Sequence, residues 1–251
     1  MTARLENRTA LVTGSTNGIG EAIAVALARE GAQVVVSGRD LDKGKQVVDT
    51  ITATGGQASF VPADLAGGST AARALAEAAT DLAGGRLDIL VNNAAMLIVP
   101  APTAEINEDL IDAALAVNVK AVFLLTGLVA PAMAARGSGA IINMGSINGL
   151  FGTARSALYS ATKATIHSLT KSWAAEYGPA GVRVNTIAPG PTLTDKISTI
   201  ADRLAPMIAA MPSRRASTPA EIAAAVLFLA SDDAANIHGA TLSVDGGRAA
   251  V

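Results

Sequence analysis

The sequence predicts an α/β fold: a single doubly wound domain in which helices flank a seven-stranded parallel sheet. Short apolar runs alternate along the chain with longer alanine-rich segments of helical periodicity. The apolar runs are continuous, as expected for strands that are buried on both faces of a parallel sheet. The chain has 251 residues, half of them hydrophobic, which suits one large domain over residues 1–251.

Each expected element follows from these patterns. The strands are predicted at Thr9–Thr13, Gln33–Ser37, Ala58–Val61, Leu87–Asn92, Gly139–Met144, Arg183–Ile187 and Thr241–Val244. The helices are predicted at Gly18–Glu30, Leu41–Ala53, Ser69–Ala83, Ile106–Arg136, Ala157–Tyr177 and Pro219–Ser231. Right-handed crossovers between such elements produce an open parallel sheet with helices on both sides. Ligands of these sheets bind at the carboxyl ends of the strands.

Composition argues against several classes of function. Nineteen basic and twenty-one acidic residues leave a net charge of −2, and aromatic residues make up only 3%, so we expect no nucleic-acid partner. The absence of cysteine excludes disulfides and thiol chemistry. His167 and His238 lack ligand-like spacing, so no metal site is expected. A polar N-terminus and the lack of an uncharged apolar run of membrane-spanning length indicate a cytoplasmic protein with no membrane partner.

A glycine-rich turn follows the first predicted strand. The segment TGSTNGIG covers residues 13–20 and leads into an amphipathic helical stretch. Gly14 permits a tight turn, Gly18 lets the backbone approach a pyrophosphate, and Gly20 allows close packing of helix and strand. Strand, glycine turn and helix in this order predict a dinucleotide-binding turn of the Rossmann type.

Four polar residues in the middle of the chain indicate acid–base chemistry. Tyr159 and Lys163 are four residues apart and share one face of a predicted helix. An ammonium beside a phenol stabilises the phenolate, so we expect Lys163 to lower the pKa of Tyr159 from about 10. Ser146 and Asn118 precede this pair and complete the candidate catalytic set.

These motifs resemble those of the short-chain dehydrogenase/reductase family, in particular its 3-oxoacyl-acyl-carrier-protein reductases, over essentially the whole chain. The resemblance also includes NNAA at residues 92–95, IAPGPTLT at 187–194 and VDGG at 244–247. One departure is Ala95, where the family usually has glycine.

The resemblance implies a role for each catalytic residue. Tyr159 would donate a proton to a carbonyl oxygen, or remove one from an alcohol, while Lys163 would also hold the nicotinamide ribose. Ser146 would form a hydrogen bond with the substrate oxygen, and Asn118 would anchor a water that connects Lys163 to solvent. Each residue taken alone also has an ordinary structural explanation, as a turn cap, a helix contact or a core side chain.

The resemblance implies an NAD(P)(H) cofactor and a set of contacts to it. These are Gly14, Thr16, Asn17, Gly18, Ile19, Gly20, Ser37, Arg39, Asp64, Leu65, Asn92, Ala94, Tyr159, Lys163, Pro189, Gly190, Thr192 and Thr194. Gly38 stands where NAD-preferring members usually carry Asp, and Arg39 can pair with a 2′-phosphate. We therefore favour NADP(H) and keep NAD(H) open. Arg39 could instead be a solvated residue, with Asp40 capping the next helix.

The substrate is expected to be a small carbonyl compound or alcohol with apolar character. A lid at about residues 193–215 would close over it. Apolar residues expected in the lid and pocket are Met96, Leu97, Ile98, Leu150, Phe151, Leu204, Met207, Ile208 and Met211. A neutral ketone, a 3-oxoacyl thioester and a hydroxysteroid-like alcohol all fit, and Arg155 is either a contact for an acidic group or a surface residue.

Three functions are therefore open. The chain is expected to be an NADPH-dependent carbonyl reductase, an NAD-dependent alcohol or hydroxysteroid-type dehydrogenase, or a non-catalytic dinucleotide sensor. The sensor is disfavoured because it has no need for four convergent catalytic residues. The long apolar helices Ile106–Arg136 and Ala157–Tyr177 are those that pair subunits in the family, which implies a homotetramer.

Overall fold

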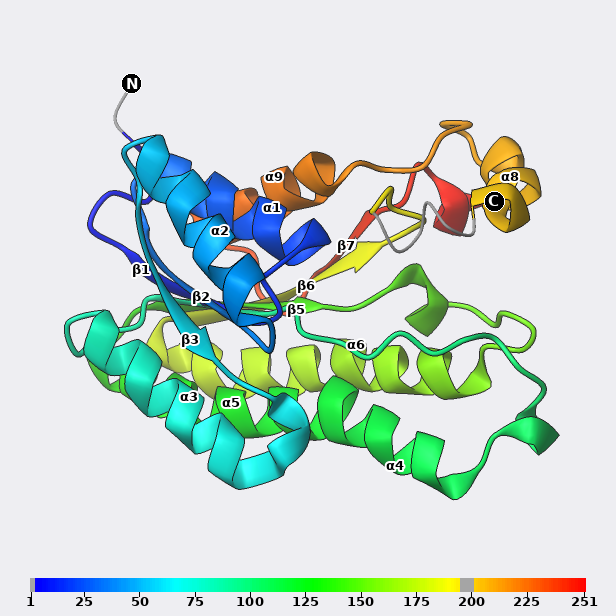
Figure 1. Ribbon diagram of the computed structural model, residues 1–251, viewed down its shortest axis with the longest axis horizontal. Helices are drawn as coiled ribbons and strands as arrows, with labels where there is room; N and C mark the ends of the chain where they lie inside the picture. The colour runs from blue at the N-terminus through cyan, green and yellow to red at the C-terminus, as the bar shows by residue number, and fades with distance from the viewer. Residues whose placement is uncertain (1–2, 195–200) are drawn as a thin grey trace.

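The computed structural model describes residues 3–194 and 201–251, and its centre is a twisted parallel sheet (Figure 1). The strand order is β3-β2-β1-β4-β5-β6-β7, with every neighbouring pair parallel. The strands are β1 Thr9–Val12, β2 Gln33–Gly38, β3 Gln57–Pro62, β4 Ile89–Asn92, β5 Gly139–Met144, β6 Val182–Pro189 and β7 Thr241–Val244. All seven expected strands form, with ends that differ by a residue or two.

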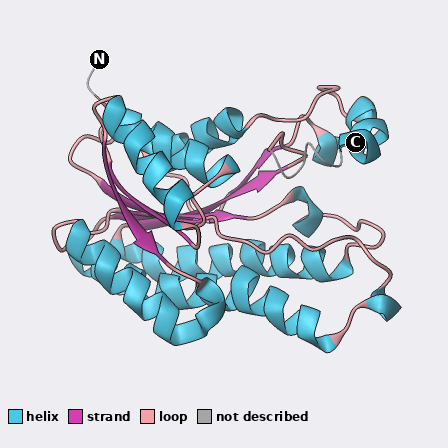
Figure 2. Ribbon diagram, in the orientation of Figure 1, coloured by secondary structure: helices cyan, strands magenta, loops and turns pink. Residues whose placement is uncertain are grey.

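Helices cover both faces of the sheet, as Figure 2 shows. One layer contains α1 Gly18–Arg29, α2 Leu41–Ala53 and α9 Pro219–Ala230. The opposite layer contains α3 Gly68–Leu82, α4 Glu108–Leu115, α5 Ala121–Arg136 and α6 Ala157–Tyr177. The predicted doubly wound α/β class is confirmed.

The continuous apolar runs arise because each strand contributes to two cores. In β4, Ile89 and Val91 belong to the core beneath α1, α2 and α9, whereas Leu90 belongs to the core beneath α3, α5 and α6. Successive side chains of a strand point to opposite faces, and here both faces are covered by helices. One continuous sheet thus contains all described strands, and the organisation of residues 1–251 as a single domain stays a prediction.

The order of the strands determines where a ligand can bind. β1 lies between β2 and β4, so the connections from β1 and from β4 run to opposite sides of the sheet. This reversal leaves a crevice at the carboxyl ends of the two strands. The glycine turn after β1 and the NNAA motif after β4 both lie at that edge.

The helix predicted at Ile106–Arg136 starts later than predicted and contains an irregular turn. It begins at Glu108, because Asn107 caps it by accepting a hydrogen bond from Leu110 N at 2.9 Å. Between α4 and α5 the backbone adopts a π-helical turn over Ala116–Lys120. Such turns insert one extra residue into a helix and often occur at functional sites. This one contains the candidate catalytic residue Asn118.

The helical run Glu108–Arg136 bears on the expectation about membranes. Within residues 3–194 and 201–251 it is the one helical run with an 18-residue stretch, of mean hydropathy 2.0, that is long and apolar enough to cross a bilayer. The run contains the charged residue Lys120, in keeping with the expected lack of an uncharged apolar run of that length. The run is weak evidence for a span, because Leu125, Val129 and Met133 are buried in the core of the fold.

The segment predicted as a lid is described in part. Residues 195–200 lie outside the described residues, and the following stretch forms the helix α8, Ala201–Ala210. Leu204, Met207 and Ile208 are half-buried, and Met211 is only 1% exposed. Met211 therefore packs into the fold and offers no mobile apolar surface.

Candidate active site

In the glycine turn after β1, glycines occupy the positions at which the backbone comes close to other parts of the chain. Gly14 has φ +61°, and a Cβ there would lie 2.7 Å from the Cα of Ala94. A Cβ at Gly20 would overlap the carbonyl oxygen of Gly14. Asn17 makes no side-chain cap bond to the start of α1, so the first N–H groups of that helix face the crevice. Such an N-terminus suits a pyrophosphate.

Three polar residues that the sequence reasoning missed hold this turn in place. Asn93 Nδ2 donates to Thr13 O at 2.9 Å and to Gly14 O at 3.0 Å. Thr13 Oγ1 accepts hydrogen bonds from the backbone N–H groups of Asn93 and Ala94, both at 3.0 Å. Ser15 Oγ donates to Val12 O at 2.6 Å and accepts from Ser37 N at 3.0 Å. The turn thus connects the ends of β1, β2 and β4.

The side chain of Asn92 is committed to the core of the fold. It is 3% exposed and donates to Asn143 Oδ1 at 2.8 Å, and Asn143 in turn donates to Thr170 Oγ1 at 2.8 Å. Asn92 is two residues after Leu90, so both side chains point beneath α5 and α6, away from the glycine turn. The cofactor contact predicted for Asn92 stays a prediction, and only its backbone can make it.

The remaining predicted cofactor contacts surround the same edge of the sheet. A Cβ at Gly18 would lie 3.3 Å from Thr194 Cγ2, so the segment after β6 meets the glycine turn. Thr192 is buried and donates to Gly190 O at 3.1 Å. The others lie at the turn, at the ends of β2 and β3, or at the end of β6: Thr16, Ile19, Ser37, Arg39, Asp64, Leu65 and Pro189. Asp64 caps a short 3-10 turn through Ala66 N at 3.1 Å.

Ser146 and Tyr159 meet at the carboxyl end of β5. Ser146 is 8% exposed, begins the short turn Ile147–Gly149, and accepts a hydrogen bond from Asn148 N at 3.2 Å. Burial raises the pKa of Tyr159, and the hydrogen bond with the Ser146 side chain opposes that rise. The direction is opposite to the expected lowering by Lys163: in the protein alone, desolvation of the phenolate raises the Tyr159 pKa, and Lys163 is not among the groups that shift it.

Lys163 lies beneath the same strand end. Its ammonium is 5.8 Å from the centre of the Tyr159 ring and donates to Met144 O at 2.7 Å. The side chain is 4% exposed, and this burial lowers the pKa of Lys163 to about 8. The helical spacing of four residues does place the phenol and the ammonium on one face of α6, as predicted.

Asn118 connects the helical run to the loop after β4. Its Oδ1 accepts from Met96 N at 2.7 Å, and its Nδ2 donates to Met96 O at 3.0 Å and contacts Thr162 Oγ1 at 3.4 Å. The side chain is therefore fully used in holding Met96 and the first turns of α6. The water contact expected of Asn118 stays a prediction.

The two histidines have different surroundings. His238 is exposed, whereas His167 is buried and lies next to Ser146 and Thr241. His167 thus reaches from α6 to the loop after β5. Within residues 3–194 and 201–251, no group of His, Asp and Glu side chains could hold a metal ion.

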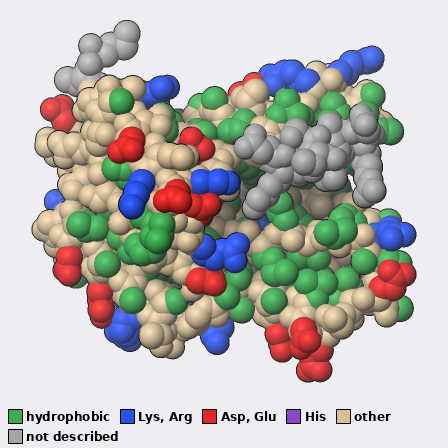
Figure 3. Space-filling model, in the orientation of Figure 1, with side chains coloured by type: hydrophobic (Ala, Val, Ile, Leu, Met, Phe, Trp, Pro, Cys, Tyr) green, Lys and Arg blue, Asp and Glu red, His purple; other side chains and the backbone are tan. Residues whose placement is uncertain are grey.

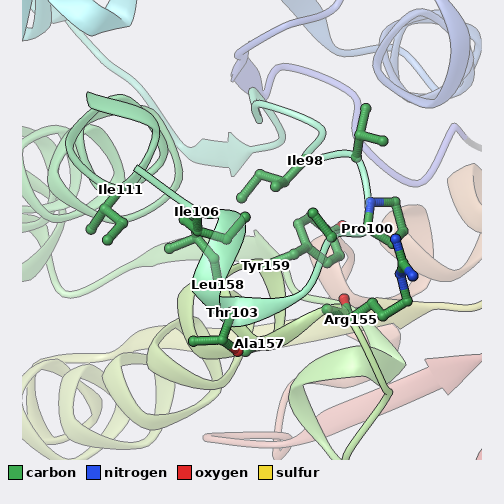
Figure 4. A pocket seen from close by; sticks show the side chains of 12 residues that line it. Ile98, Pro100, Thr103, Ile106, Ile111, Arg155, Ala157, Leu158 and Tyr159 are labelled. Carbon is green, nitrogen blue, oxygen red and sulfur yellow. The ribbon is translucent and has the colours of Figure 1, made fainter. Parts of the chain in front are cut away.

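A cavity of about 270 Å³ borders Tyr159, between the loop after β4 and the start of α6 (Figure 4). Apolar side chains form most of its wall, and Figure 3 shows apolar side chains gathered over the region of α4 and α6. Of the predicted pocket residues, Ile98 lines this cavity, whereas Leu97 and Leu150 are exposed. Arg155 stands at its edge beside Pro100, with a backbone φ of +64° that is unusual for a residue with a side chain.

Comparisons with known proteins agree with this geometry. A family model described as enoyl-(acyl carrier protein) reductase matches residues 14–249. A solved structure of a short chain dehydrogenase/reductase family protein is 43% identical, with a TM-score of 0.90 and coverage of 99% of this chain and 100% of that chain. The chain belongs to the short-chain dehydrogenase/reductase family.

Two further relatives have more specific names. Cis-4-hydroxycyclohexanecarboxylate dehydrogenase from Sinomonas cyclohexanicum is 39% identical, with 97% of both chains covered. The structure of a 3-oxoacyl (acyl-carrier-protein) reductase from Agrobacterium tumefaciens C58 with NADP bound is 34% identical, has a TM-score of 0.91 and covers 98% of this chain and 95% of that chain. The protein is accordingly an NAD(P)-dependent oxidoreductase acting on alcohol or ketone groups.

The buried ammonium of Lys163 leads to a prediction about stability. The folded-state pKa of about 8 lies below the ordinary value of 10.5, so above pH 8 the unfolded chain binds more protons than the folded one. Stability from this group therefore rises with pH. Between pH 8 and 10, the free energy of unfolding of the wild type should rise relative to that of Lys163→Met by on the order of 1 kcal/mol per pH unit. Urea unfolding at several pH values measures this, and a flat or falling difference would contradict the assignment.

Proposed function

We propose that the protein is an NADPH-dependent reductase of an apolar ketone or 3-oxoacyl group, with Asn118, Ser146, Tyr159 and Lys163 as its catalytic residues. The observation that carries the proposal is the convergence of Ser146, Tyr159 and Lys163 at the carboxyl end of β5. Three side chains capable of polarising and protonating one oxygen gather where ligands of this fold bind.

Each residue has a distinct part in the proposed reaction. The nicotinamide, when bound, supplies or accepts the hydride. Tyr159 donates its proton to the carbonyl oxygen, and Ser146 stabilises the charge that develops on that oxygen. Lys163, fixed by Met144 O, keeps a cation near the resulting phenolate and presents its other N–H groups to the ribose. Asn118 holds Met96 and contacts Thr162, and it anchors the water through which Lys163 exchanges protons with solvent.

The proposed preference for NADPH rests on the end of β2. Arg39 is exposed there, and its guanidinium can pair with a 2′-phosphate. A Cβ at Gly38 would lie 2.6 Å from Thr16 Cγ2, so the carboxylate that selects NAD in other members has no room unless Thr16 moves. Asp40 is the next acidic side chain, and it caps α2 by accepting from Lys43 N at 3.1 Å. The proposed contacts are those predicted from the sequence, except that Asn92 can contribute only its backbone.

A second candidate, oxidation of a small cyclic secondary alcohol, is favoured by the cavity beside Tyr159. Its volume of about 270 Å³ is at the lower end for ligand sites, and its wall is mostly apolar. The relative from Sinomonas cyclohexanicum is named for a hydroxycyclohexane that carries a carboxylate. Arg155 at the edge of the cavity could pair with such a carboxylate while the hydroxyl faces Tyr159.

The location and assembly of the protein are part of the proposal. We propose a cytoplasmic homotetramer of single-domain subunits, with neither a nucleic-acid nor a membrane partner. The near-neutral net charge of −2 supports the absence of a nucleic-acid partner. The helices α5 and α6, which bear exposed apolar residues such as Phe123, would supply the subunit contacts. Light scattering after size-exclusion chromatography measures the mass of the assembly.

Tyr159→Phe should lower the turnover of any accepted ketone by at least about 100-fold, because the proton donor is lost. Tyr177→Phe is the matched control, since Tyr177 is the only other tyrosine and lies at the far end of α6. Steady-state assays with cyclohexanone and an acetoacetyl thioester, in parallel with NADPH titrations, separate catalysis from binding. Undiminished turnover in Tyr159→Phe would sink the tyrosine assignment, and binding without turnover in the wild type would favour the sensor.

Arg39→Gln should weaken NADPH binding by about 10- to 100-fold, the value of a charge-assisted hydrogen bond, and leave NADH binding within about threefold. Arg29→Gln, an exposed charge at the end of α1, is the control for net charge. Fluorescence titration at matched ionic strength gives both dissociation constants. Equal losses for the two nucleotides would remove the phosphate assignment.

Arg155→Asn tests the second candidate, because asparagine tolerates a positive φ and carries no charge. We expect kcat/KM for cis-4-hydroxycyclohexanecarboxylate to fall by about 10-fold or more, and kcat/KM for cyclohexanol to stay within about twofold. The comparison between the two alcohols controls for any general damage. A parallel fall for both alcohols, or none for either, would show that Arg155 does not read the carboxylate.

A further inference from the structure

We infer that His167 is a positioning residue that sets the orientation of Ser146. The inference rests on the proposed function only in that Ser146 must be the group that binds the substrate oxygen. It stands on the contacts of His167 with the loop after β5 and on the shape of that loop.

His167 extends the active face of α6 by one turn. Tyr159, Lys163 and His167 follow one another at intervals of four residues, so they share a helix face. Each of the three contacts the end of β5 or the loop after it. Lys163 donates to Met144 O at 2.7 Å, the Tyr159 hydroxyl is close enough to the Ser146 side chain to influence its pKa, and His167 Nε2 lies 2.9 Å from Ser146 O.

The partners of the imidazole determine its tautomer. Ser146 O can only accept a hydrogen bond, so Nε2 must carry the proton. Nδ1 then accepts from the hydroxyl of Thr241, whose Oγ1 is 3.3 Å away at the start of β7. Burial lowers the pKa of His167; the hydrogen bond with the Ser146 backbone opposes this, and the nearby charges of Lys163 and Lys171 add to the lowering. A neutral ring therefore connects α6, the loop after β5 and β7.

The loop is shaped to receive this ring. A Cβ at Gly145 would lie 2.5 Å from His167 Cε1, and a Cβ at Gly149 would lie 2.7 Å from His167 Cδ2. The two glycines lie on either side of Ser146 in the sequence. Because they have no side chains, the imidazole has room to pack against the backbone between them. Neither glycine has a positive φ, so close approach and not turn geometry explains the absence of side chains.

The hydrogen bond from His167 to Ser146 O helps to fix the orientation of the Ser146 hydroxyl, because both groups belong to the same residue. Ser146 has extended backbone, φ −167° and ψ 153°, and its carbonyl is the group that His167 holds. The same carbonyl also accepts a hydrogen bond from Gly149 N at 3.0 Å, so loss of the His167 bond would remove one of the two groups that orient this peptide. A shift of about 1 Å in a catalytic group can cost about 100-fold in rate, so a fixed carbonyl matters for turnover.

His167→Gln and His167→Asn form the decisive pair. Both side chains are neutral amides, but the Gln nitrogen reaches the position of Nε2, whereas the Asn nitrogen reaches only that of Nδ1. We expect His167→Gln to keep kcat within about fivefold of the wild type and His167→Asn to lose about 10- to 100-fold. The nucleotide dissociation constant should stay within about twofold in both, because α6 and the glycine turn are unchanged. Steady-state assays on the ketone that the wild type reduces best, with thermal unfolding as the check on folding, supply the values.

Equal kcat in the two variants would overturn the inference. Thr241→Val provides a second test if either variant folds poorly, because it removes only the hydroxyl behind the ring. It should lower kcat by about threefold to tenfold with unchanged nucleotide affinity, and an unchanged kcat would refute the bridge to β7. Failure of this inference is distinguishable from failure of the proposed function. If the proposed function is wrong, Tyr159→Phe keeps full turnover; if only this inference is wrong, Tyr159→Phe still loses turnover.

Discussion

The hydrogen bond from Lys163 to Met144 O is the interaction on which the rest of the site depends. A buried ammonium is costly unless it has a hydrogen-bond partner, and the carbonyl at the end of β5 supplies one. That bond attaches α6 to the strand, and the attachment brings Tyr159 beside Ser146. This hydrogen bond does not fully offset the cost of burying the charge, because burial still lowers the pKa of Lys163 to about 8. The ammonium therefore begins to lose its proton in mildly alkaline solution.

A second constraint is that several flexible connections are held by side-chain amides. Asn93 binds two carbonyls of the glycine turn, and Asn118 binds both backbone groups of Met96. An amide carries a donor and an acceptor, so one side chain can satisfy a loop that has no strand partner. In the case of Asn118, the π-helical turn aims the amide at the loop. The crevice is therefore lined by segments that regular secondary structure alone would leave loosely placed.

Much of the site was predictable because it depends on local spacing. The Tyr159–Lys163 pair follows from the helical period, and the position of Gly14 follows from the turn after a buried strand. The burial of the Asn92 side chain and the hold of Asn93 on the glycine turn were not predicted, although strand alternation from Leu90 contains the signal. The π-helical turn at Asn118 and the direction of the Tyr159 pKa shift were also missed. Both depend on neighbours that are distant in sequence.

The sequence by itself determined the fold class, the strand and helix positions, the family and the residues able to carry out acid–base chemistry. It did so because the period of apolar residues and the position of glycines are local properties of the chain. Only the tertiary structure decided which polar groups are desolvated and which are paired across elements. The placement of His167 against Ser146, the commitment of Asn118 to Met96 and the position of Arg155 at the cavity edge belong to this group. These depend on packing between segments far apart in sequence, which no local pattern encodes.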